Sequence, residues 1–168
     1  MAIETSDRLD ITLRDVKPDD ADLLLAIFAG TREKERQTVQ WRPAEWADFV
    51  RSQQELQTAH YSKHFAEASH RIILCLGIPV GSIWVCRSRD EIRLLDLAIL
   101  PGYRSKGIGT HLIHRLQAEA IELGKQLRHT VESDNLSALR FYLRLGFRKV
   151  DEYGLHISME WNGPTHPV

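Results

Sequence analysis

The chain has 168 residues, with 22 Lys and Arg against 23 Asp and Glu, and a formal net charge of -1. This balance gives no overall field to hold nucleic acid or an anionic membrane, and no apolar run approaches the ~20 residues that span a bilayer. The length is typical of one domain, so we expect a single domain over residues 1–162 and a frayed tail over residues 163–168.

Targeting and cysteine usage both favour a cytoplasmic protein. The first residues lack the basic and apolar regions of a signal peptide. Cys75 and Cys86 lie on a predicted hairpin whose tight turn is Leu76-Gly77. That turn sets Cys75 beside it and Cys86 at the far end, beyond the ~7 Å limit for a disulfide. We therefore expect two free thiols.

The first half of the chain alternates between predicted strands and helices. Apolar and polar residues alternate before Pro18, and proline with acidic residues then opens a helix. In chain order we expect a strand over residues 9–15, a helix over 18–30, an irregular polar segment over 32–41, a helix over 43–65, and a hairpin of 71–76 with 80–87.

The second half begins with a long apolar strand, whose continuous run predicts burial on both faces. A helix with apolar residues at helical spacing follows and ends at Gly124, which suits a left-handed cap. The expected elements are a strand over residues 92–100, a helix over 107–123, a strand over 127–132, a helix over 135–145, and a hairpin of 147–150 with 155–161.

The turn between the apolar strand and its helix predicts an anion site. The amides of residues 104–109 can point into one concavity, in front of the positive end of the helix dipole. Gly107 and Gly109 allow close approach, and Arg104 and Lys106 add positive charge. The dinucleotide pattern needs a third glycine, and the Walker pattern needs its lysine after the glycine. A ligand that carries a pyrophosphate fits this turn.

The pattern Arg-x-x-Gly-x-Gly after a strand resembles the acyl-CoA loop of the GCN5-related N-acetyltransferase (GNAT) superfamily. A second motif farther along the chain strengthens the resemblance. GNAT proteins carry V-x-x-x-N-x-x-A-x-x-x-Y-x-x-x-G-F, and this chain matches it with Val131, Asn135, Ala138, Tyr142, Gly146 and Phe147. The two motifs stand in the order and on the elements that the family uses.

The resemblance implies an α/β (α+β) fold. The family has a mixed seven-stranded sheet flanked by about four helices, and the sheet splays open between the fourth and fifth strands. It also implies an N-acetyltransferase in which a primary amine attacks the thioester of acetyl-CoA directly, in a ternary complex. That mechanism uses no metal, and family members are often homodimers.

The resemblance further assigns the residues that would hold acetyl-CoA as co-substrate. The pyrophosphate would lie on residues 104–110, and the pantetheine arm would run along residues 97–99. A backbone amide at or near Ile99 would stabilise the oxyanion. Asn135 would contact the cofactor and cap its helix. The full set is Leu97, Ala98, Ile99, Arg104, Ser105, Lys106, Gly107, Ile108, Gly109, Thr110, Asn135 and Tyr142.

Two residues are candidates for acid and base. Tyr142 matches the general acid of the family, which protonates the departing thiolate. An alkyl amine has a pKa near ~10.4, so presenting it neutral at pH 7 costs about 4–5 kcal/mol and makes a base useful. Asp96, a carboxylate inside an apolar run, is the first candidate, followed by Glu132, Asp134 and water. A structural pairing of Asp96 with Arg71, Arg93 or a backbone amide is the alternative.

Other readings stay open at this point. The acceptor is either a small-molecule amine or a peptide or protein amine, and the acyl group is not fixed by the sequence. A different class of function is a non-catalytic acyl-CoA-binding regulatory module, which a test for turnover would separate from an enzyme. The pairs His60 with His64 and His111 with His114 have metal-ligand spacing but no evident third ligand, so we expect no metal site.

Overall fold

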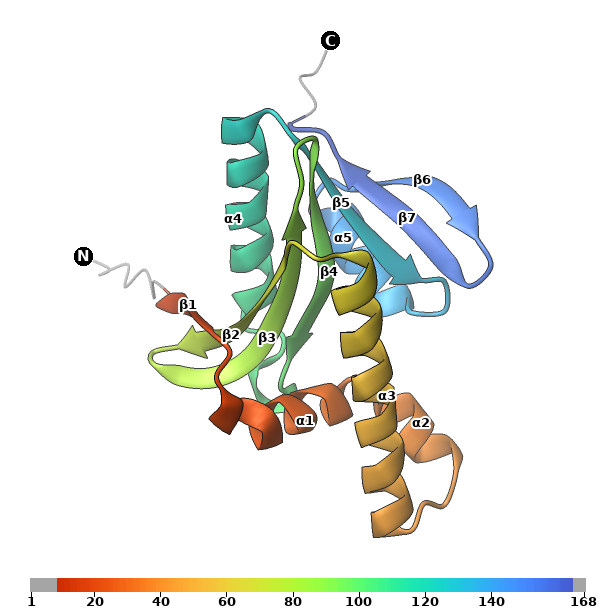
Figure 1. The fold of residues 1–168 in the computed structure, drawn as a ribbon. Coiled ribbons are helices and arrows are strands. Elements are labelled where there is room, and N and C mark those ends of the chain that lie inside the picture. Colours follow the sequence, from red (N-terminus) through yellow and green to blue (C-terminus); the bar gives the residue numbers. More distant parts are fainter. Residues whose placement is uncertain (1–8, 165–168) are drawn as a thin grey trace, which may run out of the picture.

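The computed structural model describes residues 9–164, so the first residues and the end of the predicted tail lie outside the described residues. A seven-stranded sheet in the order β1-β2-β3-β4-β5-β7-β6 forms its centre (Figure 1). Its strands are β1 (Ile11–Asp15), β2 (Ala68–Cys75), β3 (Ile78–Arg87), β4 (Glu91–Ile99), β5 (Gln126–Glu132), β6 (Arg148–Tyr153) and β7 (His156–Trp161). Only β4 and β5 are parallel neighbours, so the predicted mixed seven-stranded sheet is confirmed.

The helices follow the predicted order with one addition. They are α1 (Ala21–Gly30), α2 (Glu33–Thr38), α3 (Pro43–His64), α4 (Ile108–Leu123) and α5 (Leu136–Arg144), with short 3-10 turns at Pro18–Asp20 and Pro101–Tyr103. The short helix α2 stands where the sequence indicated an irregular segment. Its polar residues bury no side chain. A local side-chain bond from Trp41 Nε1 to the Glu35 carbonyl (2.8 Å) supports it, which apolar periodicity does not reveal.

The sheet opens between β4 and β5, as the resemblance implied. These strands pair only from Glu91 with Gln126 to Leu94 with His129, and beyond that point β5 pairs with β7 alone. Leu95 of β4 has no opposite residue on β3, which makes a bulge in β4. The bulge lies directly after Leu94, where the pairing of β4 with β5 ends. The opening leaves one edge of β4 unpaired over its last residues.

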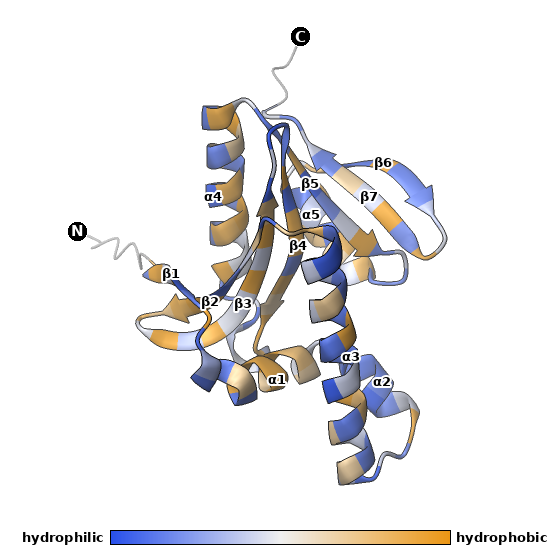
Figure 2. Ribbon diagram, in the orientation of Figure 1, coloured by the Kyte–Doolittle hydropathy of each residue, from blue (hydrophilic) through white to orange (hydrophobic). Residues whose placement is uncertain are grey.

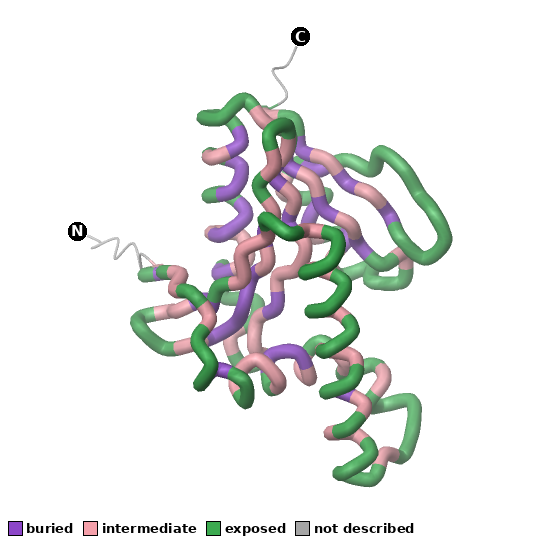
Figure 3. The backbone as a smooth tube through the Cα atoms, in the orientation of Figure 1, coloured by how far each residue is buried: buried purple, intermediate pink, exposed green. Residues whose placement is uncertain are grey.

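Two helical layers cover the two faces of the sheet. Strand residues alternate, so Ile83 and Val85 pack in the core cluster with α4 and α5, whereas Ser82 and Trp84 face α1 and α3. Figure 2 shows the apolar residues of α4 gathered on one side of that helix, and Figure 3 shows the same side buried while β6 is exposed along its length. The core therefore lies between the central strands and α4.

The apolar run of β4 is less buried than its composition indicated. Ile92, Leu94 and Ala98 are buried, but Leu95, Asp96 and Leu97 are only half-buried. The expectation of burial on both faces is thus wrong for the middle of this strand. The splay uncovers its edge, and a cavity lies in front of it.

Two smaller predictions can also be checked. Cys75 lies opposite Ile78 and Cys86 opposite Ala68, at the two ends of the β2–β3 hairpin, and both thiols are free. Within residues 9–164, no helix is long and apolar enough to span a membrane.

Candidate active site

The turn that leads into α4 forms a cradle of main-chain amides, which we call the cradle and define as residues 104–110. Ser105 and Gly107 take left-handed backbone conformations, with φ of 58° and 84°. In the part of the chain that the structure describes, none of the amides of residues 105–110 donates to another protein group. Unpaired amides at the N-terminus of a 16-residue helix attract an anion.

The geometry requires a glycine at position 107 and leaves little room for a side chain at position 109. A Cβ on Gly107 would lie 3.2 Å from Leu9 Cδ1, at a φ that side chains rarely adopt. A Cβ on Gly109 would lie 3.3 Å from the Phe141 ring, which packs beneath the first turn of α4. The glycines therefore serve the turn itself and its packing against Leu9 and Phe141.

The side chain of Arg104 has a different place from the one we expected. Its Nε donates to the Ile99 carbonyl (2.8 Å) and its Nη2 to the Gly30 carbonyl (2.8 Å). The guanidinium thus ties the end of α1 to the end of β4. Lys106 holds its ammonium 5.7 Å from the centre of the Tyr103 ring. The cradle is built mainly from main-chain groups, with charge beside it.

The free edge of β4 continues from the cradle toward the splay. The Leu100 amide donates to the Val80 carbonyl (2.8 Å) on β3. Hydrogen bonding alternates along an antiparallel strand, so the amides of Leu97 and Ile99 face the other edge, where β5 has turned away. This edge offers main-chain donors and acceptors to an extended ligand and to an oxyanion.

Tyr142 lies on α5, on the α4 side of the sheet. Its ring is 4.4 Å from the His129 ring and 5.3 Å from the Phe147 ring, measured between centroids. Burial, together with the nearby charge of Asp96, raises the pKa of Tyr142 above its usual value. The hydroxyl is therefore protonated at neutral pH. Asn135 caps α5 by accepting from the Ala138 amide (3.1 Å), as predicted.

Asp96 lies on β4 directly after the bulge and faces α1 and α3. Burial raises the pKa of this carboxyl to about 6, and the Arg32 guanidinium partly opposes the rise. Arg32 itself stacks over the Phe28 ring at 4.9 Å, which keeps its charge near the sheet. A carboxyl with this pKa is largely ionised at pH 7 and still accepts a proton readily.

The alternative role of Asp96, a structural ion pair, is not seen. Arg71 pairs with Asp15 (3.3 Å) on β1, and Arg93 pairs with Glu91 (2.8 Å) on its own strand. Among residues 9–164, Asp96 forms no ion pair within 4.0 Å. Its carboxylate is available to a ligand.

The other two carboxylate candidates are placed less well. Glu132 and Asp134 are exposed at the end of β5 and in the turn after it. The Asp134 carboxylate lies 3.7 Å from Lys34 Nζ, which links α2 to this turn. Of the three, Asp96 lines the cavity described next, and Glu132 and Asp134 do not.

That cavity, which we call the front cavity, lies between α1, α3 and strands β2 to β4. Its volume is about 330 Å³. Its sheet side includes Asp96, the first base candidate of the sequence analysis, together with His70, Ser82 and Trp84. Tyr61 of α3 donates to the Leu95 carbonyl (3.0 Å) and so fixes α3 against the bulge. No motif marks these residues, because five elements supply them.

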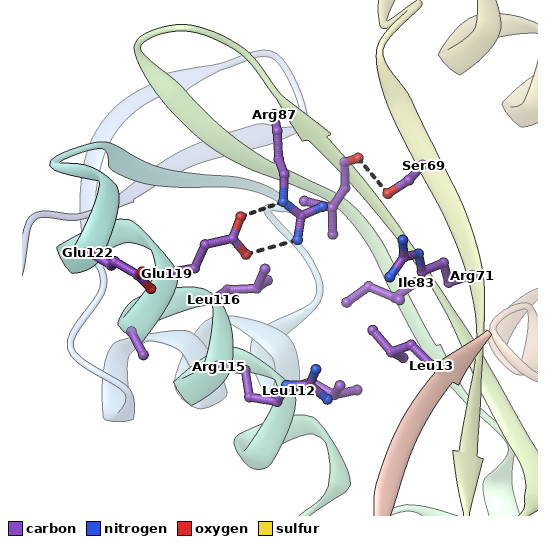
Figure 4. Close-up of a pocket in the computed structure, with 12 residues that line it drawn as sticks. Leu13, Ser69, Arg71, Ile83, Arg87, Leu112, Arg115, Leu116, Glu119 and Glu122 are labelled. Carbon is purple, nitrogen blue, oxygen red and sulfur yellow. Dashed lines mark hydrogen bonds and ion pairs between the residues drawn. The ribbon is translucent and has the colours of Figure 1, made fainter. Parts of the chain in front are cut away.

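A second hollow of about 300 Å³ lies on the other face, between α4 and strands β1 to β3 (Figure 4). Arg87 and Glu119 form a bidentate ion pair across it. The Ser69 hydroxyl donates to the Val85 carbonyl (3.3 Å). Neither Asp96 nor Tyr142 lines it. It is separate from the arrangement described above.

The histidine pairs do not assemble with further ligands. The rings of His60 and His64 are 4.6 Å apart on α3. The described residues contain no group of three or more His, Cys, Asp or Glu side chains placed to hold a metal ion.

A splayed sheet beside an amide cradle, with a tyrosine and a carboxyl at the splay, defines a class of acyl-CoA-dependent transferases. The sequence pattern of the Acetyltransferase (GNAT) family matches residues 35–147, most of the chain. The chain belongs to this family and is an acetyltransferase. An uncharacterised N-acetyltransferase of Mycobacterium tuberculosis is 29% identical over 110 residues, which cover 63% of this chain and 69% of the relative.

Solved structures share the fold. The PaiA N-acetyltransferase of Thermoplasma acidophilum, in complex with coenzyme A, has a TM-score of 0.67 at 19% identity and covers 92% of this chain and 99% of its own. An acetyltransferase from Thermus thermophilus has a TM-score of 0.64 at 22% identity, over 90% of this chain and 96% of its own. At these identities the likeness concerns the fold.

Proposed function

We propose that this protein transfers the acetyl group of acetyl-CoA to a primary amine, by direct attack within a ternary complex. One observation carries the proposal: the side chains of β4 line the front cavity, and the end of β4 leads into the cradle. The amides of Leu97 and Ile99 face the splay, while Asp96 and Ala98 on the same strand line the cavity. Two substrates bound at these places would meet across a single strand.

The cradle fits the pyrophosphate of acetyl-CoA. Its unpaired amides, the dipole of α4 and the charge of Lys106 all favour an anion there. The free edge at residues 97–99 suits the amide groups of the pantetheine arm, which would extend the sheet as an added strand. Asn135 would contact the co-substrate from the N-terminus of α5. A cradle for the pyrophosphate next to a free strand edge for the pantetheine arm supports acetyl-CoA as the acyl donor.

Asp96 is the base that the geometry favours. It would receive the ammonium group of the acceptor, bind it as an ion pair, and take a proton directly or through water. Its pKa of about 6 lies near neutral pH, which suits a general base. The amine nitrogen then attacks the thioester carbon, and the amide of Ile99 or its neighbour stabilises the oxyanion as the negative charge develops.

Tyr142 is the candidate acid. When the carbon–sulfur bond breaks, the coenzyme A thiolate needs a hydrogen-bond donor, and the protonated Tyr142 hydroxyl can supply it. A free thiol has a pKa near ~8.5, below that of a phenol, so the hydroxyl acts first by donating a hydrogen bond to the developing thiolate. As the intermediate collapses, its nitrogen loses its second proton to solvent, while Tyr142 gives its proton to sulfur and regains one from solvent, so the products are the amide and free coenzyme A, with one proton left on Asp96.

Three wider expectations stay part of the proposal. Residues 1–162 would form one catalytic domain. The two free thiols, Cys75 and Cys86, suit a reducing compartment such as the cytoplasm. The homodimer that the family resemblance implies stays a prediction, as does the absence of a nucleic-acid or membrane partner.

Calorimetric titration with acetyl-CoA and with coenzyme A tests the first step. Micromolar binding of both supports the cradle, and failure to bind at millimolar concentration would remove the proposal. Thiol release with a panel of amines tests the second step. If the protein binds acetyl-CoA but no amine in the panel causes thiol release, and water does not cause even slow release, the protein would be a binding module instead.

A further inference from the structure

The second hollow, which we call the back hollow, lies on the face of the sheet opposite the front cavity. It has a volume of about 300 Å³ and is enclosed by α4 and strands β1 to β3. The residues that line it include none of residues 97–99 or 104–110, and neither Asp96 nor Tyr142. A ligand in the back hollow would therefore touch neither the cradle nor the front cavity.

The base of the back hollow is apolar. Leu13 and Ile83 contribute to it from the sheet, and Leu112 and Leu116 contribute from α4. Ile83, Leu112 and Leu116 belong to the buried core, whereas Leu13 is only half-buried. A hollow of about 300 Å³ lies at the small end of the range for ligand pockets, so it has room for the apolar body of a small molecule.

Three arginines surround this apolar base. Arg71 comes from β2, Arg87 from β3 and Arg115 from α4. Figure 4 shows the side chains of Arg71 and Arg115 directed into the back hollow from its strand side and its helix side. Both residues are exposed, so a ligand in the hollow can reach their guanidinium groups.

The three arginines differ in how far the protein uses their donors. Arg87 donates through Nε and Nη2 to the two carboxylate oxygens of Glu119. Within residues 9–164, Arg71 has one ion pair, from its Nε to Asp15 Oδ1 at 3.3 Å, and the Asp15 side chain is 85% exposed. Arg115 has one hydrogen bond in the same range, at 3.5 Å to a main-chain carbonyl of β1. Because a guanidinium has five N–H donors, Arg71 and Arg115 keep donors for a ligand.

The charge of the lining favours a ligand with a single negative charge. Arg87 and Glu119 neutralise each other, which leaves Arg71 and Arg115 against one further lining carboxylate, that of Glu122. Glu122 lies seven residues after Arg115 on α4, about 10 Å along the helix axis. A guanidinium matches a carboxylate in shape and charge, and the Glu122 carboxylate would repel a ligand with several negative charges.

We propose that the back hollow binds a small organic acid, with its carboxylate between Arg71 and Arg115 and its apolar body on the base formed with α4. The site takes a ligand that is neither the acyl donor nor the amine of the proposed reaction. The inference does not rest on the proposed function, because it uses none of the residues assigned to acetyl transfer.

Octanoate is the probe, since it joins one carboxylate to an apolar chain. Octanamide has the same chain without the charge, and acetate has the charge with almost no apolar body. Hydrogen bonds from charged groups correspond to about 10–100-fold in affinity. We expect calorimetry to give a Kd for octanoate at least about 10-fold lower than that for octanamide or for acetate. Equal affinity for octanoate and octanamide would overturn the carboxylate contact.

Variants assign the binding to the two arginines. Arg71→Gln and Arg115→Gln each remove one guanidinium and should weaken octanoate binding by about 10-fold, with little effect on octanamide. Glu122→Gln removes the lining carboxylate and should strengthen octanoate binding by up to about 3-fold at low salt and less at high salt. Arg148→Gln, the same change on the exposed strand β6, is the control and should leave the affinity intact. Circular dichroism and Tm show whether each variant is folded.

A titration of the protein saturated with coenzyme A completes the test. The octanoate affinity should stay the same, because the back hollow shares no lining residue with the cradle or with residues 97–99. If coenzyme A blocks octanoate, the acid occupies the cradle or the edge of β4, and the inference is wrong.

Two further results would overturn the inference. One is a folded Arg71→Gln and a folded Arg115→Gln protein that both bind octanoate as tightly as the unchanged protein does. The other is a failure of the unchanged protein to bind octanoate at millimolar concentration. Neither result touches the proposed acetyl transfer, which the titration with acetyl-CoA tests by itself.

Discussion

The cradle and the front cavity adjoin the same strand but are made in different ways. The cradle consists of consecutive main-chain amides held by two positive φ angles. The front cavity consists of side chains from α1, α3 and three strands that are distant in sequence. A site of the first kind depends on where a Cβ is tolerated, and a site of the second kind depends on which side chains face inward. Substitutions should therefore act on the two sites in different ways.

The largest expected effect is on the cradle. Gly107→Val places a branched side chain at φ 84°, against Leu9, and disturbs the amides of the turn. We expect the affinity for acetyl-CoA to fall by at least about 100-fold in calorimetry, which corresponds to roughly 3 kcal/mol. Gly102→Ala is the matched control, because nothing lies within 4 Å of its Cβ and its φ is ordinary.

A folded Gly107→Val protein that still binds acetyl-CoA with near-normal affinity would contradict the cradle. The circular dichroism spectrum and Tm, measured without ligand, show whether the variant is folded. Gly109→Ala gives a milder second test, since its Cβ meets only the edge of the Phe141 ring at 3.3 Å.

The same contrast between neighbouring and distant residues explains which features of the molecule could be predicted from the sequence. The Gly107 turn, the Asn135 cap and the Tyr142 helix each depend on neighbours in sequence, and their patterns predicted them. The splay between the fourth and fifth strands came from the family resemblance and is confirmed. Helix α2 was not predicted, because its residues show no apolar periodicity; its long-range contact of Lys34 with Asp134 is exposed and is not visible in the local sequence.

The front cavity shows what local patterns leave out. His70 in its own sequence is one residue of an alternating strand, and only the register of three strands brings it into line with Trp84 and Asp96. Arg104 shows the reverse case. Its position in the motif was correct, but its side chain donates to the Ile99 and Gly30 carbonyls instead of standing free in the cradle.

The next effect in size concerns Tyr142, which lies at the splay between the two sites. Tyr142→Phe removes the hydroxyl and keeps the packing of the ring. We expect kcat to fall by about 10–100-fold with little change in acetyl-CoA affinity, because the hydroxyl matters only as charge develops on sulfur. Tyr103→Phe, beside the cradle, is the control and should keep kcat. An unchanged kcat in Tyr142→Phe would remove this residue from the mechanism.

Asp96 gives the front cavity a pH signature. Below about pH 6 the carboxyl holds a proton and can neither bind the ammonium group nor act as base. The slope of log kcat/KM against pH should therefore steepen as the pH falls through about 6. Asp96→Asn should remove this break and lower kcat/KM at pH 7 by about 10–100-fold. Rates are measured with one acceptor across the range.

Neighbours of Asp96 sharpen this test. The Arg32 guanidinium lowers the pKa of Asp96, so Arg32→Met should move the break to higher pH. Glu132→Gln should leave it in place, because Glu132 is exposed and does not line the cavity. If the break in the pH profile disappears in Glu132→Gln and persists in Asp96→Asn, the general base would be Glu132 and not Asp96.

The smallest effect on function is expected for Arg104, although its position belongs to the cradle motif. Arg104→Leu removes two hydrogen bonds that join the end of α1 to the end of β4. We expect the free energy of unfolding to fall by about 1–3 kcal/mol, visible as a lower Tm, while the affinity for acetyl-CoA changes by less than about 3-fold. Lys106→Leu should do the opposite: Tm stays the same, and affinity falls a few-fold at low salt and less at high salt. If Arg104→Leu instead lost more than about 10-fold in affinity with an unchanged Tm, its guanidinium would be a phosphate ligand, and the distinction between a main-chain cradle and a side-chain cavity would no longer hold at this position.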